Sequence, residues 1–261
     1  MPAANYNAAV LANGAAGENV MLLTARWDET TPAPACGQFY MLRAWKAEEA
    51  PLLSRPISVH RFDREKKEIS FLYEVRGTGT QKLAALRPGD TVALTGPSGR
   101  GFPVDGTLGG AVALVGGGIG IPPMLGCAQY TQGKSTAILG GRSADKIILQ
   151  NCFQDECAKV LTATDDGSLG HHGFVDALVR QELEGDQNYD AVLACGPRPM
   201  LRNVARVAEE FGVPCQVSME ERMGCGVGAC LVCACDMADG SRKHVCKDGP
   251  VFDSREVNWD V

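Results

Sequence analysis

The chain has 261 residues and a net charge of −6, with 45% hydrophobic and 21% charged residues. This composition is that of a globular protein able to bury a core, and the length allows two medium-sized domains plus a small appendage. The negative charge balance argues against a protein that binds nucleic acid through a basic surface.

Neither end of the chain nor its interior carries a pattern typical of export or membrane insertion. Residues 1–17 are rich in Ala and Asn, without a positively charged start or a long apolar run, so we expect no secretory signal. The longest apolar stretch, residues 111–126, is interrupted by glycines and prolines and is not expected to span a membrane. We therefore expect a cytoplasmic protein whose eleven cysteines stay reduced or bind metal.

Short apolar or alternating segments, separated by turn residues, predict β-strands in the first part of the chain. They are Val20–Arg26, Gln38–Ala44, Pro56–Phe62, Ile69–Glu74 and Thr91–Gly96. A short helix is expected near Thr80–Leu86, and turn residues such as those of Arg87–Asp90 separate the strands. This pattern predicts an N-terminal antiparallel β-barrel.

From Gly109 onward, apolar strands alternate with helices. The expected strands are Ala111–Val115, Ser135–Gly140, Lys159–Thr164 and Ala191–Cys195, and the expected helices begin near Pro122 and cover Val175–Glu184 and Pro199–Phe211. Such alternation predicts a parallel, doubly wound sheet. The predicted fold class is therefore multidomain α+β, with a barrel domain over residues 1–107, an α/β nucleotide-binding domain over 108–215 and a cysteine-rich module over 216–261.

Two motifs in the barrel half could bind phosphate groups. Arg55, Pro56, Ile57 and Ser58 open a predicted strand, where a guanidinium can pair with a phosphate through its forked donors. Gly77, Thr78, Gly79 and Thr80 precede the short helix, and glycines followed by a hydroxyl at a helix start favour an anion. Each motif alone could equally be a strand-edge turn or a helix cap. Together they fit a dinucleotide laid across a barrel.

A glycine-rich turn follows the first strand of the α/β half. Gly116, Gly117, Gly118 and Gly120 lie between this strand and a helix that contains Pro122 and Pro123. Such a turn lets a pyrophosphate approach the backbone. The G-x-G-x-x-G pattern is not met, because Ile121 or Pro123 occupies the third glycine position, and a purely structural tight turn is the alternative.

Cys195, Gly196 and Pro197 end a later predicted strand, at the sheet edge where open α/β sheets bind ligands. A cysteine at that edge could contact a nicotinamide, or it could be a small buried hydrophobe. Arg142 ends another strand and could meet the 2′-phosphate of NADP or be a solvated strand end, which leaves NAD against NADP open.

Four cysteines near the C-terminus carry the most specific signal in the chain. Cys225, Cys230, Cys233 and Cys246 follow the spacing C-x4-C-x2-C…C. This is the ligand pattern of a plant-type [2Fe–2S] cluster. The glycines in the first loop suit this prediction, because they allow tight turns and let backbone N–H groups point at the sulfurs.

The alternative interpretation of these cysteines is a structural zinc site or a reactive thiol. Zinc sites usually contain two close pairs of ligands, and His244 lies close enough in sequence to Cys246 to be considered. Cys235 shares a face with Cys233 if this stretch is a strand, and we interpret it as a packed thiol.

In this order, the motifs resemble the electron transfer subunit of class B dihydroorotate dehydrogenase, within the ferredoxin–NADP reductase superfamily. The resemblance runs from about Val20 to Val251 and includes Glu220–Cys225, which leads into the cysteine cluster. The chain departs from the family at Cys36, where a proline is common.

The resemblance implies a set of cofactors and a partner. It implies that FAD is bound by Arg55, Pro56, Ile57, Ser58, Gly79 and Thr80, that NAD lies near the Gly118 turn and Cys195, Gly196 and Pro197, and that the four cluster cysteines hold a [2Fe–2S] cluster. The implied partner is an FMN-containing subunit that oxidises dihydroorotate to orotate in pyrimidine biosynthesis, in a complex with two copies of each subunit.

Electron counting gives the expected order of the cofactors. A nicotinamide exchanges two electrons as hydride and an iron–sulfur cluster exchanges one, so a flavin must lie between them. The expected path runs from the partner's flavin to the cluster, then to FAD and NAD⁺, and needs no catalytic side chain. The alternatives are the small subunit of NADH-dependent ferredoxin:NADP oxidoreductase, of sulfide dehydrogenase or of anaerobic sulfite reductase, and, more remotely, a zinc-binding interaction module.

Overall fold

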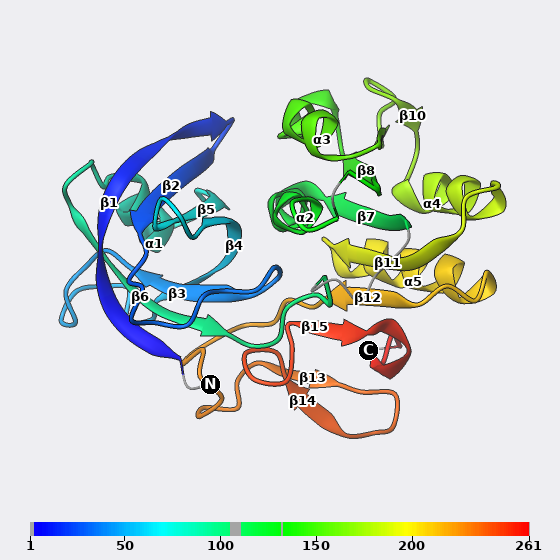
Figure 1. Cartoon of the computed structure of the whole chain (residues 1–261). Coiled ribbons are helices and arrows are strands. Elements are labelled where there is room, and N and C mark those ends of the chain that lie inside the picture. Colours follow the sequence, from blue (N-terminus) through cyan, green and yellow to red (C-terminus); the bar gives the residue numbers. More distant parts are fainter. Residues whose placement is uncertain (1–2, 105–110, 132, 261) are drawn as a thin grey trace.

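The computed structural model describes residues 3–104, 111–131 and 133–260. It contains a closed β-barrel, a seven-stranded sheet flanked by helices, and a two-stranded hairpin beneath them (Figure 1). This arrangement confirms the predicted fold class. None of the helices in the described ranges has the length and apolar character needed to cross a membrane.

The N-terminal barrel is antiparallel throughout. Its strands are β1 (Ala4–Gly17), β2 (Val20–Arg26), β3 (Phe39–Arg43), β4 (Arg55–Asp63), β5 (Glu68–Glu74) and β6 (Thr91–Ser98), and α1 (Thr78–Ala84) follows β5. They close in the order β1-β2-β5-β4-β3-β6, so β1 pairs with both β2 and β6. Aromatic and aliphatic side chains such as Tyr40, Phe71 and Leu23 fill the interior.

The strand β1 was not predicted from the sequence. It is rich in Ala and Asn, which have low strand propensity, and only Ala8 and Val10 are buried along its length. The strand forms because the two barrel edges on either side of it pair with its backbone, which removes both open edges.

The second domain is built on a mostly parallel sheet. Its strands are β7 (Ala111–Gly117), β8 (Ser135–Gly141), β9 (Lys159–Thr164), β10 (His171–His172), β11 (Tyr189–Cys195), β12 (Cys215–Ser218) and β15 (Val251–Asp253), in the order β10-β9-β8-β7-β11-β12-β15. Its helices are α2 (Ile121–Ala128), α3 (Gln150–Glu156), α4 (Val175–Glu184) and α5 (Arg198–Glu210). Helices α2 and α3 cover the barrel side of the sheet, and α4 and α5 cover the other side (Figure 1).

The C-terminal segment contributes to the sheet as well as to the cluster region. β15 pairs antiparallel with β12, whereas β13 (Ala234–Asp236) and β14 (Arg242–His244) form a separate hairpin. The expected boundary between residues 107 and 108 lies outside the described residues, and the expected boundary at 215/216 falls within β12.

Helix α2 joins the barrel to the sheet. His60 Nδ1 lies 3.0 Å from the carbonyl oxygen of Pro122, and a Cβ atom added at Gly126 would lie 2.7 Å from the carbonyl oxygen of His60. Arg61 on β4 forms an ion pair with Glu156 at the end of α3. The two domains are therefore in contact through their backbones, at Gly126 and His60, as well as through side chains.

A disulfide also joins the two domains. The expectation that the cysteines stay free or bind metal is wrong for Cys36 and Cys127, whose sulfur atoms are bonded in this structure. The sequence could not show this pairing, because the residues are 91 positions apart and meet only when α2 packs on the barrel.

Replacing Gly126 with Ala is expected to weaken this domain contact. The new methyl group clashes with the His60 carbonyl, which is part of the backbone of β4. The higher helix propensity of Ala offsets only about 1 kcal/mol of this cost. We expect a net loss of about 1–2 kcal/mol in the free energy of unfolding, measured by chemical denaturation. Gly14→Ala is the matched control, because nothing lies within 4 Å of its added Cβ. Equal stability of the two variants would contradict this account.

Candidate functional site

The loop from Cys225 to Cys230 wraps its backbone around a thiol. The N–H groups of Val227, Ala229 and Cys230 donate to Cys225 Sγ at 3.4, 3.3 and 3.4 Å. The loop can turn this tightly because Gly226 and Gly228 have φ angles of +71° and +81°, in the left-handed region that favours glycine.

The four predicted ligands are arranged as two pairs. The Cys225 N–H donates to Cys230 Sγ at 3.4 Å, reciprocating the bond from Cys230, and the Cys246 N–H donates to Cys233 Sγ at 3.5 Å. The Gly228 N–H donates to Cys246 Sγ at 3.1 Å and so links the two pairs. Among the described residues, no group of three or more His, Cys, Asp or Glu side chains could hold one metal ion.

The two pairs differ in their surroundings. Desolvation raises the pKa of the Cys225 thiol, but the backbone N–H donors outweigh it and lower the pKa to about 6. Burial, followed by the neighbouring thiol of Cys233, raises the pKa of Cys246 to about 12. The site therefore offers one thiol prepared as a thiolate at Cys225, and metal binding at Cys246 must release a proton.

His244 and Cys235 are not part of this arrangement. His244 Nδ1 faces Asp248 at 3.7 Å, and its backbone N–H donates to the same carboxylate. Cys235 is 1% exposed on β13 and packs in the same core as Cys233, as expected for a packed thiol.

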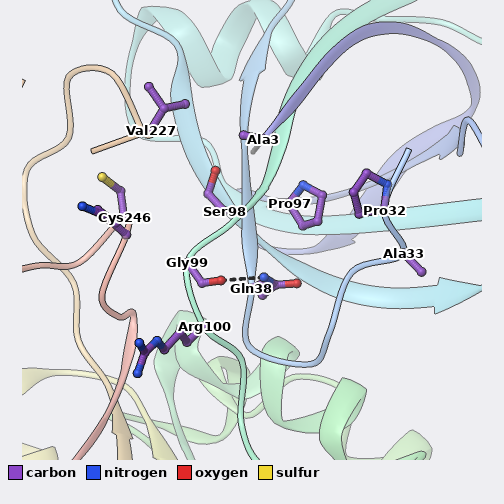
Figure 2. A pocket seen from close by; sticks show the side chains of 12 residues that line it. Ala3, Pro32, Ala33, Gln38, Pro97, Ser98, Gly99, Arg100, Val227 and Cys246 are labelled. Atoms are coloured by element: carbon purple, nitrogen blue, oxygen red, sulfur yellow. Dashed lines mark hydrogen bonds between the residues drawn. The ribbon is translucent and has the colours of Figure 1, made fainter. Parts of the chain in front are cut away.

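The cluster loop lies at the molecular surface. Val227, Leu231 and Val232 are exposed by 49, 59 and 56%, and Cys230 is exposed beside them. A cavity of about 470 Å³ lies between part of this loop and the barrel, with Val227 and Cys246 on one side and Pro32 and Pro97 on the other (Figure 2). At Gly226 the loop contacts the barrel directly, because an added Cβ would lie 2.3 Å from Met41 Cγ on β3. Several exposed apolar side chains close together are typical of a protein–protein contact.

The two barrel motifs lie next to each other in the structure. A Cβ atom added at Gly79 would lie 2.5 Å from Nε of Arg55, so the absent side chain lets the guanidinium lie against α1. Thr80 Oγ1 accepts the N–H groups of Arg76 and Gly77 at 3.0 and 3.1 Å, which orders the loop before the helix. Arg55 Nη1 donates to the Leu53 carbonyl at 2.7 Å.

A second cavity, of about 240 Å³, lies where the barrel meets the end of β12. The predicted residues Pro56, Ile57 and Ser58 line it together with Tyr73 and Glu220. Tyr73 Oη is buried without a hydrogen-bond partner among the described residues, and burial raises the pKa of this phenol. Apolar residues such as Ile57 and Met219 line the cavity together with polar ones such as Ser58, and this mixture fits a flavin ring.

Tyr73 and Glu220 were not singled out as site residues from the sequence. Tyr73 is one of several apolar residues on β5, and no local pattern separates it from the barrel core. Glu220 lines the cavity as an exposed residue, but nearby protein atoms partly desolvate its carboxyl. This desolvation raises the pKa of the carboxyl, and the positive charge of Arg76 lowers it by a smaller amount.

The glycine-rich turn packs mainly against protein. An added Cβ would lie 2.3 Å from the Cys195 carbonyl oxygen at Gly120 and 2.4 Å from Met200 Sδ at Gly117. Gly118, with φ of +54°, has nothing within 4 Å of its added Cβ. Most of these glycines therefore let two strand-end loops approach each other, and Gly118 is the one that faces open space.

Cys195 lies at the end of β11 beside this turn, as the sequence predicts. Gly196, with φ of +156°, approaches the Gly117 backbone, and an added Cβ there would lie 3.1 Å from Gly117 Cα. Cys195 is 2% exposed, and burial raises the pKa of its thiol to about 12. The two loops form one edge of the sheet, but the thiol itself is packed inward.

Comparisons with known proteins agree with this geometry. Residues 220–258 match the iron–sulfur cluster binding domain of dihydroorotate dehydrogenase B. The structure is similar to one described for an NADH-dependent reduced ferredoxin–NADP oxidoreductase, with a TM-score of 0.84, 28% identity and coverage of 97% of this chain and 90% of that one. A ferredoxin reductase of carbazole 1,9a-dioxygenase, 24% identical with a TM-score of 0.68, shares the fold over 82% of this chain and 68% of its own.

Similarity extends along the chain in curated sequences. The chain is 43% identical over 221 residues to the dihydroorotate dehydrogenase B (NAD⁺) electron transfer subunit of Clostridium acetobutylicum, covering 85% of each. It is 38% identical over 253 residues to the corresponding subunit of Caldanaerobacter subterraneus subsp. tengcongensis, covering 96% of this chain and 97% of the relative. The chain thus belongs to the family of electron transfer subunits of NAD-dependent dihydroorotate dehydrogenase B.

Proposed function

We propose that this chain carries electrons between an FMN-containing catalytic subunit, which oxidises dihydroorotate to orotate, and NAD⁺ in the cytoplasm. Residues 1–107 would hold FAD, 108–215 the nicotinamide nucleotide and 216–261 a [2Fe–2S] cluster. The complex would contain two copies of each subunit and serve pyrimidine biosynthesis. When bound, FAD supplies the conversion between hydride transfer and single-electron transfer that the other two groups cannot make alone.

The observation that carries this proposal is the pairing of the four thiols. Cys225 with Cys230 and Cys233 with Cys246 offer two ligands at each of two positions, which suits two irons better than one tetrahedral zinc ion. The backbone N–H groups directed at the sulfurs would stabilise the added negative charge of a reduced cluster and would thus raise its potential.

For FAD we propose the residues predicted from the sequence, Arg55, Pro56, Ile57, Ser58, Gly79 and Thr80. Arg55 and Gly79 lie together on the barrel surface, where a guanidinium and a close backbone approach suit a pyrophosphate. Tyr73 extends this set, since the residue lines the cavity beside Ile57 and Ser58 and its buried hydroxyl has no hydrogen-bond partner among the described residues. The barrel residues would orient the ring and exclude water from one of its faces.

For NAD we propose the edge formed by the turn of Gly116, Gly117, Gly118 and Gly120 with Cys195, Gly196 and Pro197. Open space at Gly118 supports a nucleotide approaching there, whereas the other glycines keep the two loops together. Cys195 would border the nucleotide as a neutral, packed thiol.

The exposed apolar residues beside Cys230 support a partner contact over the cluster, because a short path for electrons needs the partner's flavin near this loop. A subunit of an NADH-dependent ferredoxin–NADP oxidoreductase is the second candidate, favoured by the structural similarity over 97% of the chain. The higher identity to dihydroorotate dehydrogenase B subunits favours the first. Co-purification of a dihydroorotate-oxidising subunit, rather than a ferredoxin-dependent one, distinguishes the two.

Replacing Cys230 with Ser is expected to abolish the cluster while FAD stays bound, since the cysteine is exposed in the cluster loop and belongs to neither barrel motif. Iron and acid-labile sulfide per FAD, with the visible spectrum before and after dithionite, measure this. Cys235→Ala is the control and should retain iron. Normal iron content in the Cys230 variant would sink the ligand assignment.

Replacing Arg55 with Gln is expected to weaken FAD binding about 10- to 100-fold, the equivalent of one or two charge-assisted hydrogen bonds. The dissociation constant of FAD, followed by flavin fluorescence in refolded apoprotein, measures the effect. Arg64→Gln, on an exposed barrel turn, should bind FAD normally. Unchanged affinity in the Arg55 variant would remove this residue from the site.

The Cys195 thiol is expected to resist alkylation in the native protein between pH 7 and 9, because burial raises its pKa to about 12 and keeps it protonated. Peptide mapping after iodoacetamide treatment measures the modified fraction. Cys152, which is half-buried on α3, should react faster. Preferential modification of Cys195 at pH 8 would show a thiolate at the nucleotide edge and contradict the packed-thiol assignment.

A further inference from the structure

Cys36 and Cys127 form the only disulfide within the described residues, and it crosses the contact between the two domains. Cys36 lies in the loop before β3 of the barrel, and Cys127 lies in the last turn of α2. Their Cα atoms are 5.5 Å apart, and the two residues are only 7 and 0% exposed. This Cα separation lies within the range that a disulfide requires.

The barrel loop is built to hold Cys36 at this position. Its carbonyl oxygen accepts the N–H of Phe102 at 2.8 Å. A Cβ atom added at Gly101 would lie 2.3 Å from the same carbonyl, and Gly37 has a φ of +85°. The thiol of Cys36 is therefore directed at α2 by backbone contacts that do not depend on the sulfur bond.

On the other side of the contact, α2 meets the barrel through noncovalent contacts at both of its ends. Pro122 near its start contacts His60, whereas Cys127 lies near its finish, one residue after the close approach at Gly126. The disulfide thus adds a covalent attachment at the end of α2 opposite to the glycine-rich turn.

We propose that Cys36 and Cys127 are a thiol–disulfide site that bonds α2 to the barrel under oxidising conditions and, under reducing conditions, leaves its C-terminal turn held only by the noncovalent contact at Gly126. In the oxidising direction, the two thiols react with a small-molecule disulfide such as oxidised glutathione. A Cys36–Cys127 bond forms, the bond of the small disulfide breaks, and two small thiols leave with the two protons. The site is redox-responsive in its own right and takes no part in electron transfer to NAD⁺.

The other cysteines among the described residues form no disulfide, and the two close pairs near the C-terminus are assigned to the cluster. Cys195 and Cys215 are buried without a disulfide partner, and burial raises the pKa of each thiol to about 12. Cys157 accepts a hydrogen bond from Ser135. The low exposure of Cys36 means that exchange needs local opening of the loop, so each redox state persists once formed.

The test uses the full chain with its cofactors, held either in oxidised glutathione or in a phosphine reductant. After denaturation and alkylation, peptide mapping should find the two peptides linked in the oxidised sample and separately alkylated in the reduced one. The oxidised protein should also unfold about 5–10 °C higher, because the bond closes a long loop. Hydrogen exchange should slow at the C-terminal turn of α2.

Cys36→Ser and Cys127→Ser should each remove the difference in unfolding temperature between the two conditions, and Cys152→Ser should retain it. The wild-type mapping and exchange measurements decide the matter even if either Ser variant at the disulfide fails to fold. Free, alkylatable Cys36 and Cys127 after oxidation would overturn the proposal. An unfolding difference that persists in the Cys36 variant would overturn it as well.

Discussion

Helix α2 packs against β4 of the barrel and against β7 of the sheet, and the absence of a side chain at Gly126 lets its backbone reach the His60 carbonyl. This contact determines the relative position of the two domains. The cavity lined by Ser58 and Glu220 exists only because the barrel and the end of β12 are held at this distance. The glycine-rich turn, which leads directly into α2, is placed by the same contact.

The cluster region depends on a different constraint, which is the supply of backbone hydrogen-bond donors in a short loop. Gly226 and Gly228 adopt left-handed angles, and the N–H groups freed by this conformation point at sulfur. The thiolate form of these cysteines is therefore stabilised by backbone N–H groups of the loop rather than by charged side chains. This leaves the loop surface apolar around Cys230, as a partner contact over the cluster requires.

Strong local patterns made much of the architecture predictable. β2, β9 and α4 begin and end where their hydrophobic periodicity does, because each buries one continuous apolar face. β1 was not predicted, because its Ala and Asn residues have low strand propensity and the strand is stabilised by pairing with β2 and β6 in the closed barrel. β15 was not predicted for a similar reason. Its three residues become a strand because β12 offers an open edge.

The sequence by itself determined the fold class and the four thiols near the C-terminus, because periodicity and ligand spacing are local properties. Only the tertiary structure decided how the thiols pair, which glycines serve packing rather than a ligand, and that Tyr73 lines a cavity. It also brought Cys36 and Cys127 together across 91 residues. Each of these features depends on distances between segments far apart in the chain, which only packing of the two domains establishes.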